Sequence, residues 1–433
     1  MENWDAIIIG GGPAGSTCAI TLAKKGRKVL LLEKGVFPRF HIGESQLPFM
    51  NKLLQNLNLL EEANKQNFIK KTGAEFVNRM GNTQRMSFTE QGSGWISDTF
   101  QVERAEFDYF LLKQARAIGA TIYENTKVNK LLFKNNRLQG VMYEQDGKKS
   151  EAYASFIIDA SGRNGIVAHH YKLRKINNKL QNIALFRHYE NYNETYFDGI
   201  PGDIQVAYDE NRWMWTIPIS ENRISVGLVI NEERLREEQK NATNEEIFEA
   251  YLQLFPRVQK RLTSANPIGK MRIESNFCYY ADSLIGPNYL LVGDSGCFVD
   301  PMFSGGVFLA MATGMKAGET LDQILNKQNS EQQLLQNYEN FYKTGYDTYL
   351  RFLYWFYESN CDFYKALNSI PTECMEGTSK KALTQLAVQL ACGNYWSENL
   401  LTAYLRSQEK YKTFKPFTAI YECPSYSKDE SRS

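Results

Sequence analysis

The chain has 433 residues, of which 43% are hydrophobic and 23% are charged. This composition is typical of a globular protein, and the length suffices for two intergrown domains around a large core. Its 50 basic and 49 acidic side chains leave a net charge of +1, which argues against binding to nucleic acid or to an anionic membrane. No apolar run approaches the roughly 20 residues that span a membrane, and no signal-peptide pattern is present.

The seven cysteines are scattered, and no pair has CxxC spacing. We therefore expect no metal site and no disulfide framework, and a cytoplasmic location fits.

Residues 5–35, "DAIIIGGGPAGSTCAITLAKKGRKVLLLEKG", predict a buried strand at 6–9, a glycine turn, a helix from 13 to about 25 and a second strand at 28–32. Glycines at the spacing GxGxxG allow a tight turn, close approach of a pyrophosphate and close helix packing. The helix N-terminus then faces the phosphates, and Glu33, about 20 residues further on, can accept hydrogen bonds from ribose hydroxyls. The residues predicted to bind the dinucleotide here are Gly10, Gly12, Pro13, Ala14, Gly15 and Glu33.

Three later segments favour FAD over NAD. They are "VERAEFDYFLL" with Arg104, "FIIDASGRNG" with Asp159 and Gly162, and "YLLVGDSGCFVDPMFSGG" with Gly293 and Asp294. Together with the first turn they resemble the FAD-binding elements of aromatic-hydroxylase-like flavoproteins. The resemblance implies a Rossmann-like α/β FAD domain in which Asp294 holds the ribityl chain. No second nucleotide fingerprint exists, so stable NAD(P)H binding is not expected.

Between about residues 166 and 268 the pattern changes to short β-branched and aromatic runs separated by polar turns. It predicts an antiparallel sheet inserted into an FAD domain of residues 1–325, placed as a wall of the substrate region. Residues 326–424 are predicted to form a helical lid region, and residues 425–433 a disordered tail.

The segment "RWMWTIP" lies in this predicted sheet and ends at Pro218. Because a strand repeats every two residues, Trp213 and Trp215 should share one face while Met214 and Thr216 share the other. Core packing explains most strand tryptophans; the alternative is a wall between two reactive compartments.

This segment resembles the WxWxIP signature of flavin-dependent halogenases. "FVDPMFSGG" similarly matches Fx(2)Px(2)SxG, and "FHIGESQLP" resembles the strap that lies across the flavin ring in that family. The resemblance implies an enzyme that uses FAD, reduced by a separate flavin reductase, with O₂ and chloride or bromide to form hypohalous acid. Trp213 and Trp215 would keep the organic substrate from the flavin. Further implied FAD contacts are Lys34, Arg39, Gly43, Glu44, Ser45, Pro301 and Gly306.

The segment "FIKKTGAEF" offers an amine that could hold hypohalous acid by a hydrogen bond or carry it as a haloamine. The family pattern places the reactive lysine at Lys71, with Lys70 as the alternative; a solvated turn is the ordinary interpretation of such a pair. The loop of Ser304, Gly305 and Gly306 is the expected halide site, because backbone N–H groups before a helix can form an anion nest. Alternatively, its glycines only make room for the flavin ring.

One residue departs from the tryptophan-type halogenases, which have a glutamate where this chain has Phe303. The pattern resembles the phenol- and pyrrole-chlorinating branch, whose substrates are in part tethered to a carrier protein, unless Glu75 supplies the missing carboxylate. The histidines suggest nothing beyond a flavin contact from His41. The competing hypotheses are a flavin hydroxylase or geranylgeranyl-reductase-like enzyme on the same scaffold, and a flavin-binding sensor without turnover.

Overall fold

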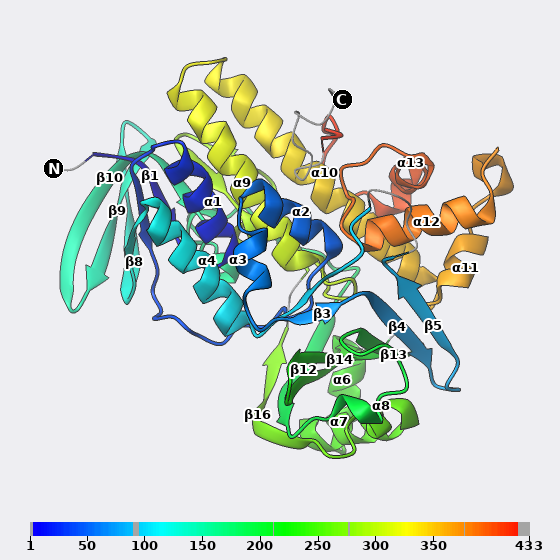
Figure 1. Ribbon diagram of the computed structural model, residues 1–433. Coiled ribbons are helices and arrows are strands. Elements are labelled where there is room, and N and C mark those ends of the chain that lie inside the picture. Colours follow the sequence, from blue (N-terminus) through cyan, green and yellow to red (C-terminus); the bar gives the residue numbers. More distant parts are fainter. Residues whose placement is uncertain (1–2, 90–94, 211, 276–277, 376, 423–433) are drawn as a thin grey trace.

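The computed structural model describes residues 3–89, 95–210, 212–275, 278–375 and 377–422, and it is built around two large sheets. In Figure 1 the first sheet lies at the upper left, the second below it, and the C-terminal helices at the upper right. The chain is thus a mixed α/β protein. The expected tail of residues 425–433 lies outside the described residues.

The first sheet has eight strands, and its central strands run parallel in the order β19-β10-β1-β2-β7. The apolar run of residues 6–9 is buried on both sides, as a parallel strand covered by helices requires. Helix α1 packs against α4 and α9. The elements are β1 (Asn3–Ile9), α1 (Pro13–Lys24), β2 (Val29–Leu32), α4 (Arg104–Ile118), β7 (Thr121–Tyr123), β8 (Thr126–Lys134), β9 (Arg137–Gln145), β10 (Lys148–Asp159), α5 (Ile166–His170), β18 (Ile285–Gly286), β19 (Tyr289–Leu291) and α9 (Gly305–Leu325).

The second sheet has seven strands in the order β16-β12-β15-β14-β13-β4-β5. The β-branched and aromatic runs expected between about residues 166 and 268 include its strands β12 (Asn182–Glu190), β13 (Ile204–Asp209), β14 (Arg212–Ser220) and β15 (Arg223–Asn231). The sheet also includes β16 (Asn266–Glu274) and, from earlier in the chain, β4 (Gly73–Asn78) and β5 (Thr83–Ser87).

Two features of this sheet differ from the expectation. Strand β4 pairs with β13 in parallel, although the other pairs are antiparallel. A pairing across more than a hundred residues leaves no local sequence signal. Strand β14 also continues beyond Pro218 to Ser220, because a register shift between these two residues accommodates the missing N–H of proline.

Helices cover both faces of the second sheet. One face packs on α6 (Glu232–Glu238), α7 (Asn244–Gln253) and α8 (Pro256–Arg261), and the tryptophan-bearing face belongs to the main core. The C-terminal part is helical, with α10 (Glu331–Glu358), α11 (Phe363–Asn368), α12 (Lys380–Ala391) and α13 (Leu400–Ser407).

Short elements connect these layers. They are α2 (Pro48–Asn56), α3 (Leu60–Asn64), β3 (Ile69–Lys71), β6 (Thr99–Gln101), β11 (Arg174–Ile176) and β17 (Tyr279–Ala281). Among the described residues, no helix is both long and apolar enough to cross a membrane. The six cysteines that the structure describes are free.

Candidate functional site

The glycine turn between β1 and α1 has the geometry of a phosphate cradle. Gly10 has φ +108°, and a Cβ there would lie 2.3 Å from the carbonyl oxygen of Ala160, so the turn requires glycine. A Cβ at Gly12 would meet only the guanidinium of Arg39, at 3.8 Å. The N-terminus of α1 therefore opens onto space beside a cation, which suits a pyrophosphate.

Glu33 directly follows β2 beside this turn and is buried. Its carboxylate accepts hydrogen bonds from the N–H groups of Gly11 (2.7 Å) and Gly35 (2.8 Å). A carboxylate has about four acceptor positions, so positions remain for ribose hydroxyls. The neighbouring Lys34 is exposed.

Arg104 connects helix α4 to the strap, which we define as residues 40–48. Its guanidinium pairs with Asp108 at 2.7 and 2.9 Å and donates to the carbonyl oxygen of Ile42 (2.5 Å). A Cβ at Gly43 would lie 2.8 Å from Arg104. Arg104 therefore positions the strap as well as contributing positive charge.

Two other predicted FAD contacts have different surroundings. Asp294 is half-buried; burial raises its pKa to about 6, while Arg104, Arg163 and Arg174 favour its charged form. Asp159 is fully buried, and its oxygens accept hydrogen bonds from Ser161 and Val167. Asp159 thus shapes the turn after β10 rather than presenting a free carboxylate. The open turn, Glu33 and the cationic groups together fit a flavin dinucleotide.

The order of strands in the second sheet separates Phe40, at the start of the strap, from the cavity beside Lys71, which the end of the strap reaches through Leu47. On β12, which lies next to the edge strand β16, Phe186 stacks on the strap residue Phe40 with ring centroids 6.4 Å apart. On the inner strands, Val206 of β13 lies opposite Trp215 of β14, and directly opposed residues share a face. Trp215 also covers Gly227 of β15. The tryptophans of β14 therefore stand between β12 and β13, and they share one face, as their spacing predicted.

Trp213 and Trp215 are buried and their ring centroids lie 5.8 Å apart. Trp213 Nε1 donates to the Tyr357 hydroxyl (2.8 Å), which donates to Asp300 Oδ1 (2.7 Å). Burial raises the pKa of Asp300, and Asn182 donates to its other oxygen. The indole N–H thus fixes the loop that leads to Ser304.

Lys71 is the last residue of β3, and only 2% of it is exposed. Its Nζ donates to Ser45 Oγ (2.8 Å) and to the carbonyl oxygen of Gln46 (2.9 Å) in the strap. Burial lowers the pKa of Lys71 to about 8, although Asp203 and Cys392 partly oppose the shift. An ammonium has three N–H donors, so one remains for a ligand.

Lys70 points the opposite way, as alternation along a strand requires. Its side chain is 68% exposed and forms an ion pair with Asp98 at 2.8 Å. Of the two lysines considered from sequence, only Lys71 faces the interior.

Lys71 lines a small cavity whose volume of about 20 Å³ leaves room for roughly one water. Among the described residues that line this Lys71 cavity, Lys71 is the only charged one. The full lining is Leu47, Lys71, Ala74, Phe76, Met86, Phe88, Ile204, Val206, Met302, Phe303, Ser304 and Ala391.

Phe303, which distinguishes this chain in sequence, packs in an aromatic cluster beside the cavity. Its ring centroid lies 4.6 Å from Phe352 and 4.8 Å from Phe356, both on α10. Glu75 does not supply the missing carboxylate, because its side chain pairs with Arg257 at 2.7 Å on the other face of β4. No carboxylate therefore lines the described part of the Lys71 cavity.

The expected halide loop is largely engaged within the protein. The N–H of Ser304 donates to the carbonyl oxygen of Pro301 (2.9 Å), and that of Gly305 donates weakly to the Tyr349 hydroxyl (3.3 Å). Gly306 lies in the first turn of α9, where N–H groups have no partner within the helix. A halide would have to displace Tyr349 from Gly305, so the site stays a prediction.

Sequence reasoning missed an ion pair at the strap. Glu44 is 1% exposed and its Oε1 lies 2.6 Å from His188 Nε2 on β12. Although burial lowers the pKa of His188, the hydrogen bond and charge of Glu44 raise it overall. The two residues are 144 positions apart, so no local pattern could have joined them.

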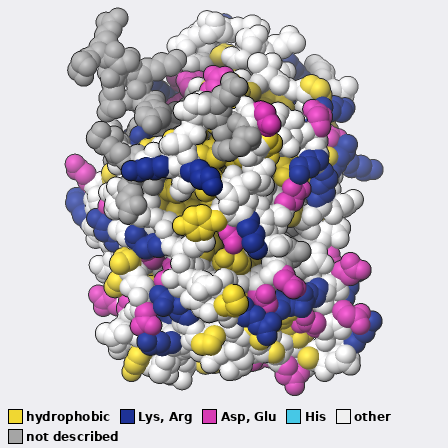
Figure 2. Space-filling model, turned by 90° about the vertical axis from the view of Figure 1, so that its right-hand side faces the viewer, with side chains coloured by type: hydrophobic (Ala, Val, Ile, Leu, Met, Phe, Trp, Pro, Cys, Tyr) yellow, Lys and Arg dark blue, Asp and Glu magenta, His cyan; other side chains and the backbone are white. Residues whose placement is uncertain are grey.

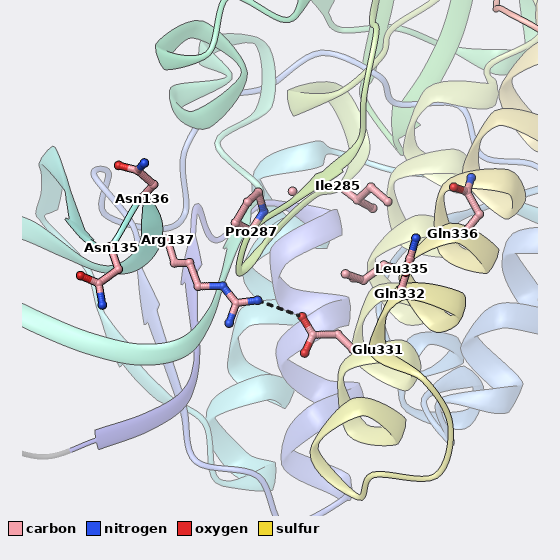
Figure 3. A pocket seen from close by; sticks show the side chains of 10 residues that line it. Asn135, Asn136, Arg137, Ile285, Pro287, Glu331, Gln332, Leu335 and Gln336 are labelled. Carbon is pink, nitrogen blue, oxygen red and sulfur yellow. Dashed lines mark ion pairs between the residues drawn. The ribbon is translucent and has the colours of Figure 1, made fainter.

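A second hollow, of about 690 Å³, lies between the start of β9 and the start of α10 (Figure 3). Arg137 and Glu331 face each other across it at 4.0 Å. The described residues that line it include no group suited to redox or transfer chemistry, and we place the site at the Lys71 cavity instead. On the face shown in Figure 2, basic and acidic side chains are interspersed, so no patch of one charge marks a docking surface there.

Comparisons with known proteins agree with this geometry. The family model described as tryptophan halogenase matches residues 5–95 and 80–381. A tryptophan 2-halogenase of Chondromyces crocatus is 31% identical over 366 residues, which are 82% of this chain and 68% of the relative. A brominase of 1H-pyrrole-2-carbonyl peptidyl-carrier protein from Pseudoalteromonas luteoviolacea is 32% identical over 329 residues, which are 75% of this chain and 79% of the relative.

Among solved structures, the myxobacterial chondrochloren halogenase, described as a variant of FAD-dependent halogenases, superimposes with a TM-score of 0.78. It is 31% identical in sequence, and the match covers 91% of this chain and 90% of that structure.

Proposed function

Because the chain belongs to the family of flavin-dependent halogenases, we propose that an oxidised halogen is transferred to an aromatic ring in its Lys71 cavity. The predicted fold, the dependence on FAD and the halogenase activity are confirmed by this membership. A hydroxylase, a geranylgeranyl-reductase-like enzyme and a sensor without turnover are not favoured.

The observation that carries the proposal is a buried amine in an apolar chamber. FAD, when bound in reduced form, supplies with O₂ the oxidising power that converts halide to hypohalous acid. Lys71 Nζ, held by Ser45 and Gln46, then either donates its third N–H to the hypohalous oxygen or accepts the halogen as a free amine. With a pKa of about 8, roughly a tenth of the molecules carry the free amine at pH 7.

The position of the two tryptophans supports the proposal that separate compartments lie on either side of them. The strap contacts β12 through Phe40 and reaches the Lys71 cavity through Leu47. Trp213 and Trp215 lie on β14, which stands between β12 and the strands β13 and β4 that line the cavity. A ring in the cavity is thereby kept from the flavin compartment, while a small oxidant follows the strap.

We propose a phenol or pyrrole as the substrate, in preference to free tryptophan. Electrophilic halogenation builds positive charge on the ring, and a carboxylate near an indole would stabilise that charge. The cavity offers Phe303 in place of a carboxylate, so the ring must stabilise itself. Of the two substrates named among the relatives, the pyrrole fits this chamber better.

Two partners follow from this proposal. The sequence carries a single dinucleotide fingerprint, so reduced FAD would come from a separate flavin reductase. A carrier-bound substrate would enter on a long flexible arm, and the chamber, which has room for one water, must open to admit it.

The test is product mass from a panel of phenols and pyrroles, each free and carrier-loaded, with tryptophan included. Each reaction contains FAD, a flavin reductase and either chloride or bromide, and a matched reaction omits halide. We expect halogenated phenols or pyrroles that require halide. Efficient halogenation of tryptophan, with none on phenols or pyrroles, would contradict the substrate class but not the enzyme class. Products that gain oxygen without halide would contradict halogen transfer.

A further inference from the structure

Two methionines line the chamber in which the oxidant is expected. Met86 of β5 and Met302 of the loop before α9 line the Lys71 cavity together with Lys71 and Ser304. We propose that Met86 and Met302 are the sites at which the enzyme oxidises itself when no aromatic substrate fills the cavity. The inference rests on the proposed delivery of hypohalous acid to Lys71.

The chemistry needs no oxidant beyond the one that the reaction forms. Hypohalous acid transfers its oxygen to the thioether, giving the sulfoxide, a halide ion and a proton. Sulfur loses two electrons and the halogen gains them. Where Lys71 carries the halogen, water supplies the oxygen, and the free amine, a halide ion and a proton are released.

The thioethers are better targets here than the nearby thiol. Cys392 lies close enough to Lys71 to affect its pKa, but burial raises the pKa of Cys392 itself. The thiolate is the reactive form of cysteine, so this thiol is held in its less reactive state. A thioether needs no deprotonation.

The different exposure of the methionines makes it possible to distinguish an oxidant formed inside the cavity from an oxidant in solution. Met86 and Met302 are 8% and 2% exposed, whereas Met80 is 82% exposed. An oxidant in solution should reach Met80 first. An oxidant released at Lys71 meets Met86 and Met302 before it can leave. Met214, fully buried on the other face of the second sheet, serves as a reference for unfolding.

Oxidation of these residues would stop the enzyme. A sulfoxide is polar and bulkier than a thioether, and Met302 lies between Asp300, which accepts its N–H, and Phe303. A substrate in the cavity would consume the oxidant first, so self-oxidation should fall as substrate is added.

The experiment is peptide mass spectrometry on the FAD-loaded enzyme after turnover with a flavin reductase, O₂ and bromide, without aromatic substrate. Catalase removes free hydrogen peroxide, and a matched reaction omits bromide. Reagent hypobromite added to resting enzyme gives the pattern for an oxidant in solution. We expect turnover to oxidise Met86 and Met302 about tenfold more than Met80, and the reagent to show the reverse order. Met214 should stay reduced in both.

A Met86→Leu/Met302→Leu variant provides a second readout, because this exchange nearly conserves volume. Relative to its own initial rate, it should survive more substrate-free turnovers than the wild type. Monochlorodimedone, which reports hypohalous acid, is assayed in parallel. Halogenation of monochlorodimedone shows that the enzyme forms hypohalous acid. If Met80 is then oxidised first, or neither cavity methionine is oxidised, the inference is overturned and the proposed function stands. If monochlorodimedone is not halogenated and no methionine is oxidised, the proposed function fails and the inference with it.

Discussion

Replacing Lys71 with methionine should make the protein more stable while abolishing halogenation. The pKa of Lys71 lies at about 8 instead of its usual 10.5, and this difference corresponds to about 3 kcal/mol of unfavourable free energy for the buried charge at pH 7. Methionine removes this cost but leaves the carbonyl of Gln46 without its donor, which costs about 1–2 kcal/mol. The net expectation is a gain of about 1–2 kcal/mol.

The assay is urea unfolding of both proteins at saturating FAD between pH 7 and 10.5. A group whose pKa is lowered in the folded state binds fewer protons there, so wild-type stability should rise as pH increases from about 8 to 10.5. The advantage of the variant should shrink over the same range. A Lys71→Met protein that is less stable than wild type at pH 7 would refute the argument, because it would mean that the buried charge is well compensated.

Three further predictions concern the chamber and its wall. If the free amine of Lys71 carries the halogen, product formed per flavin oxidised should fall about tenfold for each pH unit below about 8; a flat profile would favour a hydrogen-bonding ammonium. Gly227→Ala places a Cβ 2.2 Å from the Trp215 ring, which should cost about 1–3 kcal/mol and lower product per flavin oxidised without loss of bound FAD; unchanged coupling would argue against the wall. Glu75→Gln removes the ion pair with Arg257 and should leave the preference for phenol or pyrrole over tryptophan unaltered, which competition between substrates would measure.

Local patterns were sufficient to predict the dinucleotide turn and the tryptophan face. Each of these predictions depends on residues that are close together in the sequence. They are the apolar run of β1, the spacing of the glycines that begins at Gly10, and the alternation of Trp213 and Trp215. The parallel pairing of β4 with β13 was not predictable, because it depends on packing between segments 130 residues apart. The continuation of β14 beyond Pro218 was likewise not predictable, because it depends on the register shift in its pairing with β15.

The choice of Lys71 over Lys70 came from the family pattern, and burial supplies the physical reason for it. The pairing of Glu44 with His188 and the lining of the cavity by Met86 arise only when distant strands meet. The occupied N–H group of Gly305 likewise depends on packing of the loop against α10, because its acceptor is the Tyr349 hydroxyl.

The most direct test of the central claim compares Lys71→Ala with Lys70→Ala, its neighbour on the same strand. Flavin oxidation and halogenated product are measured together by absorbance and mass spectrometry. We expect Lys71→Ala to keep FAD binding and flavin oxidation but lose more than about 10²-fold in product, and Lys70→Ala to match the wild type. Retention of more than about a tenth of the product by Lys71→Ala would contradict the role of Lys71, and loss of product in Lys70→Ala would transfer that role to Lys70.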